Sequence, residues 1–125
     1  MERLIGIPYK WRGSSYDGVD CWGLCQLYYK MVGRRLPDIL ELYLEKKECL
    51  SMGHVKENIR HKFSKVEEPV KGDICLFNIQ GLPVHVGIYI DKLTFLHSTE
   101  GSTSSICRFT DPKYKTKLDS FWRTI

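Results

Sequence analysis

Three side chains of this sequence have the types that nucleophilic catalysis requires: the thiol of Cys21 and the imidazoles of His85 and His97. A cysteine supplies a nucleophile, a histidine can remove its proton, and a second polar group can hold that histidine in place. Taken singly, a cysteine is most often a small buried hydrophobe and a strand histidine a packed or surface residue. A cysteine at a helix start together with two histidines on facing strands favours catalysis.

Cys21 stands where a loop is expected to become a helix. Residues 13–18 are rich in glycine and serine, whereas the residues after Cys21 form an apolar set at three- and four-residue spacing that ends near Gly33. Asp20 is the expected N-cap, so Cys21 is predicted to be the first residue of a helix that ends near Val32. Because helix N-termini carry unpaired N–H groups and a positive dipole end, we expect this thiol to be activated by position alone.

The two histidines fall on two segments that are predicted to be neighbouring strands. His85 is the polar member of the apolar segment 84–90, and it lies on the face opposite the valines and isoleucines. His97 lies near the end of segment 93–98, which follows a turn at residues 91–92. An antiparallel pairing centred on that turn sets His85 opposite His97, with Cβ atoms within about 5 Å of each other.

The other elements indicate the fold class. The segment 39–64 has apolar residues at helical spacing and is predicted to form one or two amphipathic helices, divided near residues 51–53. Further strands are predicted at residues 74–77, 104–109 and 121–125. The expected class is α+β, with N-terminal helices packed on an antiparallel β-sheet. Because 125 residues suffice for one domain and not for two, residues 1–125 are predicted to form a single domain.

Composition and charge argue against several functions. The net charge of +4 comes from scattered basic residues that form no stripe with aromatic side chains, so nucleic-acid binding is not supported. A weak attraction to an anionic polymer such as a bacterial cell wall is allowed. No apolar run is long enough for a membrane span, and the N-terminus lacks the long apolar region of a secretory signal. We therefore expect a protein that is cytoplasmic as synthesised and that is delivered by a virion or by an export route without a signal.

The five cysteines are odd in number and show no paired metal-binding spacing, which favours free thiols. The predicted catalytic trio could instead bind a metal, but it would provide only three ligands, and the only nearby carboxylate is Asp20. We therefore expect neither a metal nor another cofactor. The remaining cysteines are expected to be structural: Cys25, Cys49, Cys75 and Cys107.

Five short motifs, taken in order, resemble those of one family of cell-wall enzymes. They are Gly6-Ile7-Pro8-Tyr9, Asp20-Cys21-Trp22-Gly23, Lys71-Gly72-Asp73, His85-Val86-Gly87-Ile88-Tyr89 and Leu96-His97-Ser98. Their combination is similar to the motif series of the NlpC/P60 superfamily of papain-like cysteine peptidases. The resemblance implies a papain-like NlpC-type fold over the whole chain. It also implies hydrolysis of the γ-D-glutamyl bond to a diamino acid in peptidoglycan stem peptides, through a thioester on the cysteine.

The resemblance also implies residue roles. Cys21 matches the nucleophile, His85 the general base and His97 the polar residue that orients the base. Gly87 is expected either to let the helix or the substrate approach the strand or to form a β-bulge. Three residues near the nucleophile are assigned to the substrate or the oxyanion, the last of them in place of the usual small serine: Tyr9, Asp20 and Trp22.

Two other functions stay open at this point. An acyltransferase of the same fold would pass the thioester to an amine or a lipid, and the bulky Trp22 is a hint of an apolar acceptor channel. A non-catalytic structural or binding module of a phage tail or cell-wall complex would keep the fold without a reactive Cys21. Because the sequence 20–24 resembles phage-tail and prophage members, the expected partners are peptidoglycan stem peptides and phage-tail or other carrier proteins.

Overall fold

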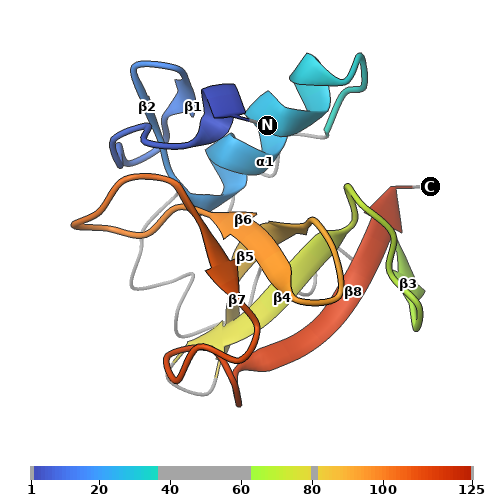
Figure 1. The fold of residues 1–125 in the computed structure, drawn as a ribbon. Coiled ribbons are helices and arrows are strands. Elements are labelled where there is room, and N and C mark those ends of the chain that lie inside the picture. The colour runs from blue at the N-terminus through green and yellow to red at the C-terminus, as the bar shows by residue number, and fades with distance from the viewer. Residues whose placement is uncertain (1, 37–62, 80–81, 125) are drawn as a thin grey trace.

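A six-stranded antiparallel sheet carries one helix on one of its faces in the computed structural model, which describes residues 2–36, 63–79 and 82–124 (Figure 1). The strand order is β3-β8-β4-β5-β6-β7, and β1 and β2 form a separate two-stranded ribbon. The elements are η1 (Glu2–Leu4), β1 (Ser14–Ser15), β2 (Gly18–Val19), α1 (Cys21–Met31), β3 (Phe63–Val66), β4 (Ile74–Ile79), β5 (Leu82–Tyr89), β6 (Thr94–His97), β7 (Ser105–Arg108) and β8 (Leu118–Thr124). This arrangement agrees with the α+β class.

Helix α1 begins and ends as its sequence indicates. Asp20 is the N-cap, and its side chain accepts a hydrogen bond of 2.7 Å from the Gly23 N–H. Cys21 is the first helical residue, Met31 is the last, and Gly33 follows with a left-handed φ of 77° that a glycine adopts without strain. The predicted helix is therefore confirmed, together with its cap.

The sheet buries two different apolar clusters, one on each face. Val86 and Ile88 of β5 pack with the apolar residues of α1 in the larger cluster. Phe77 and Phe95 belong to a second, aromatic cluster on the opposite face. The side chain of His85 contacts Phe77 on that second face, at 5.8 Å between ring centroids, so the predicted alternation along β5 is confirmed.

Several hydrogen bonds tie the N-terminal third of the chain to the sheet. The buried Ser104 hydroxyl donates to the Leu4 carbonyl at 2.6 Å and accepts from the Ile7 N–H at 2.9 Å. In the last turn of α1, the Tyr29 hydroxyl donates to the Gly72 carbonyl at 2.7 Å. The residues before and after Cys21 are thereby both joined to segments that adjoin the sheet strands.

Two predictions about the strands need correction, and one further pair of strands was not predicted. Phe63 and Ser64 were expected at the end of a helical segment, but they pair with β8 as part of β3, because cross-strand pairing overrides a local helical pattern. Strand β8 lies inside the sheet, between β3 and β4, and begins earlier than predicted. The short ribbon of β1 and β2 was not predicted. The rest of the helical prediction for 39–64 lies outside the described residues.

Candidate active site

The nucleophile candidate, Cys21, lies at the N-terminus of α1 and is partly exposed. Asp20 holds this end of the helix in place. Its second carboxylate oxygen accepts a hydrogen bond of 3.1 Å from the Arg12 N–H, so the same side chain caps the helix and fixes the preceding loop. The residue before the cysteine therefore has a clear structural role, whatever it contributes to substrate binding.

The thiol of Cys21 faces β5. The backbone N–H of Val86, the residue next to His85, lies close enough to hydrogen-bond the sulfur and lowers its pKa, as do the N–H groups of Trp22 and Cys21 itself. Burial and, second, the charge of Asp20 outweigh these groups and raise the pKa of Cys21 to about 12. The expected activation by position alone is therefore wrong for the folded protein, because desolvation has a larger effect on the pKa than the helix N-terminus at this site.

The two predicted catalytic histidines are in direct contact. Nε2 of His85 lies 3.0 Å from Nδ1 of His97, and both side chains are buried. Burial, followed by the neighbouring His97, lowers the pKa of His85 to about 3. Burial also lowers the pKa of His97 to about 4, with Asp111 acting to raise it and Lys113 to lower it. Both rings are therefore neutral at pH 7, and His85 uses its Nε2 for the contact with His97.

The histidines meet along a diagonal and not directly across the strands. Ile88 pairs with Leu96, so continuing the antiparallel register sets His97 opposite Gly87 and not opposite His85. A Cβ at Gly87 would lie 2.8 Å from the Leu96 carbonyl oxygen and 3.4 Å from the His97 Cβ. The predicted register is thus wrong by two residues. Gly87 makes room for the neighbouring strand β6, and not for the helix or the substrate as expected.

Gly87→Ala is expected to disturb the histidine pair and to cost stability. The added methyl group meets a backbone oxygen at 2.8 Å, so β6 must shift. Overpacking of this kind costs about 1–3 kcal/mol of unfolding free energy. Urea denaturation and the kcat of the variant measure the two effects.

Gly101→Ala is the matched control for this variant. Gly101 has a left-handed φ of 85°, and no described atom lies within 4 Å of an added Cβ. The control should lose stability through backbone strain while its kcat stays at the wild-type level. Equal kcat losses in both variants would contradict the role of Gly87 in placing His97.

Tyr9 and Trp22, the other two residues predicted to contact the substrate or the oxyanion, differ in their position relative to the candidate site. Tyr9 is half-buried, and its backbone forms a bridge with Val19, two residues before the nucleophile, so it lies beside the candidate site. Trp22 is fully buried, and its ring meets that of Phe63 edge-to-face at 6.0 Å between centroids. The Trp22 side chain is therefore not brought to the candidate site, and it lends no support to an apolar acceptor channel.

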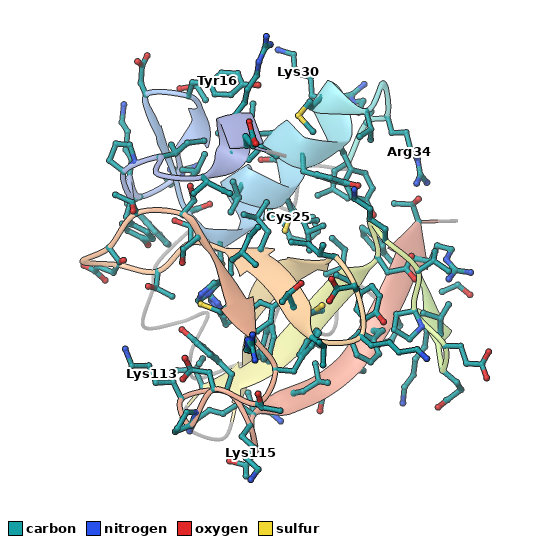
Figure 2. All side chains as sticks on the ribbon, viewed as in Figure 1. Tyr16, Cys25, Lys30, Arg34, Lys113 and Lys115 are labelled. Atoms are coloured by element: carbon teal, nitrogen blue, oxygen red, sulfur yellow. The ribbon has the colours of Figure 1, made fainter. Side chains whose placement is uncertain are left out.

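Two residues beside the histidines were missed by the sequence analysis. Tyr114 lies in the turn after β7, with its ring 5.0 Å from that of His97. Cys107 of β7 has its sulfur 3.0 Å from Nε2 of His97. Lys113 and Lys115 point away from the sheet in the same turn (Figure 2). Because the basic residues of this stretch are typical of a solvated loop, the sequence gives no signal that Tyr114 contacts His97.

Two other kinds of site are absent from the described residues. Their His, Cys, Asp and Glu side chains form no group of three or more that could hold a metal ion. No helix within residues 2–36, 63–79 and 82–124 is long and apolar enough to cross a membrane.

Comparison with known proteins places this chain in a family. Residues 6–123 match the model of the NlpC/P60 family, and the chain belongs to that family. It is 27% identical over 121 residues to murein DD-endopeptidase MepS/murein LD-carboxypeptidase of Escherichia coli K12, covering 96% of this chain and 57% of that protein. It is 31% identical over 102 residues to murein DD-endopeptidase MepH of the same strain, covering 78% of this chain and 33% of that protein.

A solved structure supports the fold independently. The structure of an NLP/P60 family protein similar to a lipoprotein from Staphylococcus aureus superposes with a TM-score of 0.70 at 23% identity, over 98% of this chain and 38% of that one. The chain thus spans little more than half of one of these curated relatives and about a third of the other.

Proposed function

We propose that this domain is a cysteine peptidase that hydrolyses amide bonds in peptidoglycan stem peptides, of the type that joins a γ-D-glutamyl group to a diamino acid. Cys21 is the nucleophile, His85 the general base and His97 the residue that orients the base. The observation that carries the proposal is the buried 3.0 Å contact between His85 and His97, on the strand whose next residue touches the Cys21 thiol. Membership of the NlpC/P60 family and the names of the murein endopeptidase relatives support the substrate class.

The reaction begins from a neutral thiol and a neutral imidazole. Because the pKa of Cys21 is raised and that of His85 is lowered, the proton stays on sulfur until the substrate arrives. Nδ1 of His85 then takes this proton while sulfur attacks the carbonyl carbon. The imidazolium returns the proton to the leaving amine as the C–N bond breaks and a thioester remains. His85 next takes a proton from water, which attacks the thioester, releases the acid and restores the thiol.

The start of α1 is suited to stabilise the tetrahedral intermediate. The backbone N–H groups of Cys21 and Trp22 both approach the reactive sulfur. Donors at this position point toward the place where a carbonyl oxygen becomes an oxyanion, and one such donor is often worth about 3–4 kcal/mol of transition-state stabilisation. Trp22 therefore contributes through its backbone, while its buried ring supports the packing of the helix.

The test is incubation of the purified chain with defined stem peptides, followed by mass spectrometry of the products. A peptidase yields two fragments that together have gained the elements of water. An acyltransferase yields, in the presence of an added amine, the adduct of that amine instead. A preparation that produces neither from any stem peptide, at several pH values, overturns the proposal and leaves a binding module as the alternative.

A further inference from the structure

The hydrogen-bonded chain in the candidate site does not end at the second histidine. His97 uses both ring nitrogens: Nδ1 lies 3.0 Å from His85 Nε2, and Nε2 lies 3.0 Å from Cys107 Sγ. The register pairs His97 with Ser105, so Cys107 is its diagonal neighbour on the same face of the sheet. The three side chains therefore form a line across β5, β6 and β7.

We propose that Cys107 is a positioning residue, whose sulfur accepts a hydrogen bond from Nε2–H of His97 and so holds that ring in the tautomer that His85 needs. The inference rests on the proposed function, in which His85 is the base. It assigns a role to a cysteine that the sequence analysis expects to be merely structural.

The direction of the hydrogen bonds follows from which ring nitrogen of each histidine carries the proton. If His85 is to accept the nucleophile's proton at Nδ1, its own proton must reside on Nε2 and point to Nδ1 of His97. His97 then carries its proton on Nε2 and donates it to Cys107. In the reverse direction, the Cys107 thiol would donate to His97, His97 would donate to His85, and Nδ1 of His85 would already be protonated. Only the first direction leaves Nδ1 of His85 unprotonated, as the proposed base requires.

The surroundings of His97 make this contact important. The ring is buried, and a buried N–H that lacks a partner is costly. Two aromatic rings flank it, those of Phe95 at 4.9 Å and Tyr114 at 5.0 Å between centroids. The charged groups that act on it, Asp111 and Lys113, have opposite effects. With its pKa lowered to about 4, the ring is neutral at pH 7 and carries one proton, so its tautomer decides its function.

Cys107 can accept a hydrogen bond from His97 because its own thiol proton can be donated to a different acceptor. The Ser105 hydroxyl oxygen lies 3.8 Å from the Cys107 sulfur. The thiol can therefore donate to Ser105 and keep its lone pairs for His97. The partly exposed position of Cys107 also means that its replacement should disturb the core less than replacement of the fully buried Cys25.

The decisive measurement is the tautomer of each imidazole ring, read from ¹⁵N–¹H correlation spectra of the ¹⁵N-histidine-labelled protein without substrate. We expect wild-type His97 to carry its proton on Nε2, and Cys107→Ser to preserve this state because a hydroxyl oxygen also accepts. Cys107→Val lacks an acceptor, so we expect the proton of His97 to redistribute to Nδ1. Cys107→Ala is the second variant in case the valine protein does not fold. A wild-type His97 protonated on Nδ1, or an unchanged tautomer in a folded valine or alanine variant, overturns the inference.

Activity gives a second readout that separates this inference from the proposed function. Cys107→Val should lower kcat by about tenfold, the equivalent of one hydrogen bond, leave KM unchanged, and be rescued by serine at the same position. Ile106→Ala is the matched control, because its side chain lies on the opposite face of the same strand and is exposed. If the wild type cleaves no substrate, the proposed function fails, whereas the spectra still decide whether Cys107 sets the tautomer.

Discussion

Cys21→Ala is expected to fold like the wild type and to lose peptidase activity by about 10⁴-fold or more. Removal of the nucleophile from a catalytic triad has an effect of at least this size, since no thioester can form. The unfolding free energy should change by no more than about 1 kcal/mol, because Cys21 is partly exposed and its helix keeps the Asp20 cap. Turnover of the best stem peptide and urea denaturation measure the two quantities.

The matched control is Cys25→Ala, one turn further along the same helix. Cys25 is fully buried in the main cluster, so its replacement should reduce the unfolding free energy while the folded fraction keeps its kcat. Cys21→Ala is thus expected to lose activity and keep its stability, whereas Cys25→Ala is expected to lose stability and keep its activity. Activity retained in Cys21→Ala would contradict the assignment of the nucleophile.

Acidification from pH 7 to pH 5 is expected to destabilise the domain. The pKa values of His85 and His97 are lowered to about 3 and about 4 in the folded protein, whereas an unfolded histidine titrates near its ordinary value of about 6.5. Below pH 6.5 the unfolded chain therefore binds protons that the folded chain excludes. Stability then falls with decreasing pH, at up to about 1.4 kcal/mol per pH unit for each histidine.

Urea denaturation at half-unit pH steps tests this dependence. The variant in which both histidines are replaced, His85→Gln with His97→Gln, is the control, and its stability should vary less between pH 7 and pH 5. A wild-type protein whose stability is flat over this interval would mean that the two rings are not held neutral by burial.

The parts of this structure that depend on neighbouring residues could be predicted from the sequence. Asp20 precedes the apolar spacing of α1 and Gly33 follows it, so the helix and its cap are encoded within a few residues. The alternation along β5 likewise separates the His85 face from the Val86 face before any partner strand is known.

The parts that depend on distant residues could not be predicted. The register between β5 and β6 brings Gly87 against the Leu96 carbonyl, and counting residues from the intervening turn does not reveal this close approach. The pKa of Cys21 depends on the partial burial of the thiol and on the charge of Asp20 in the folded chain, and these two causes reverse the effect expected from the helix N-terminus. Cys107 and Tyr114 reach the histidines only through the arrangement of β7 and its following turn.

The hydrogen bonds of Ser104 to Leu4 and Ile7 have a consequence for the order in which the chain folds during its synthesis. They join residues about a hundred positions apart, and β8, near residue 120, must enter between β3 and β4 to complete the sheet. A ribosome-bound chain that already displays Cys21 therefore lacks the strands that support its proposed base. Contacts this distant in sequence form slowly, so the domain should acquire its reactive site only after nearly all of it has left the ribosome.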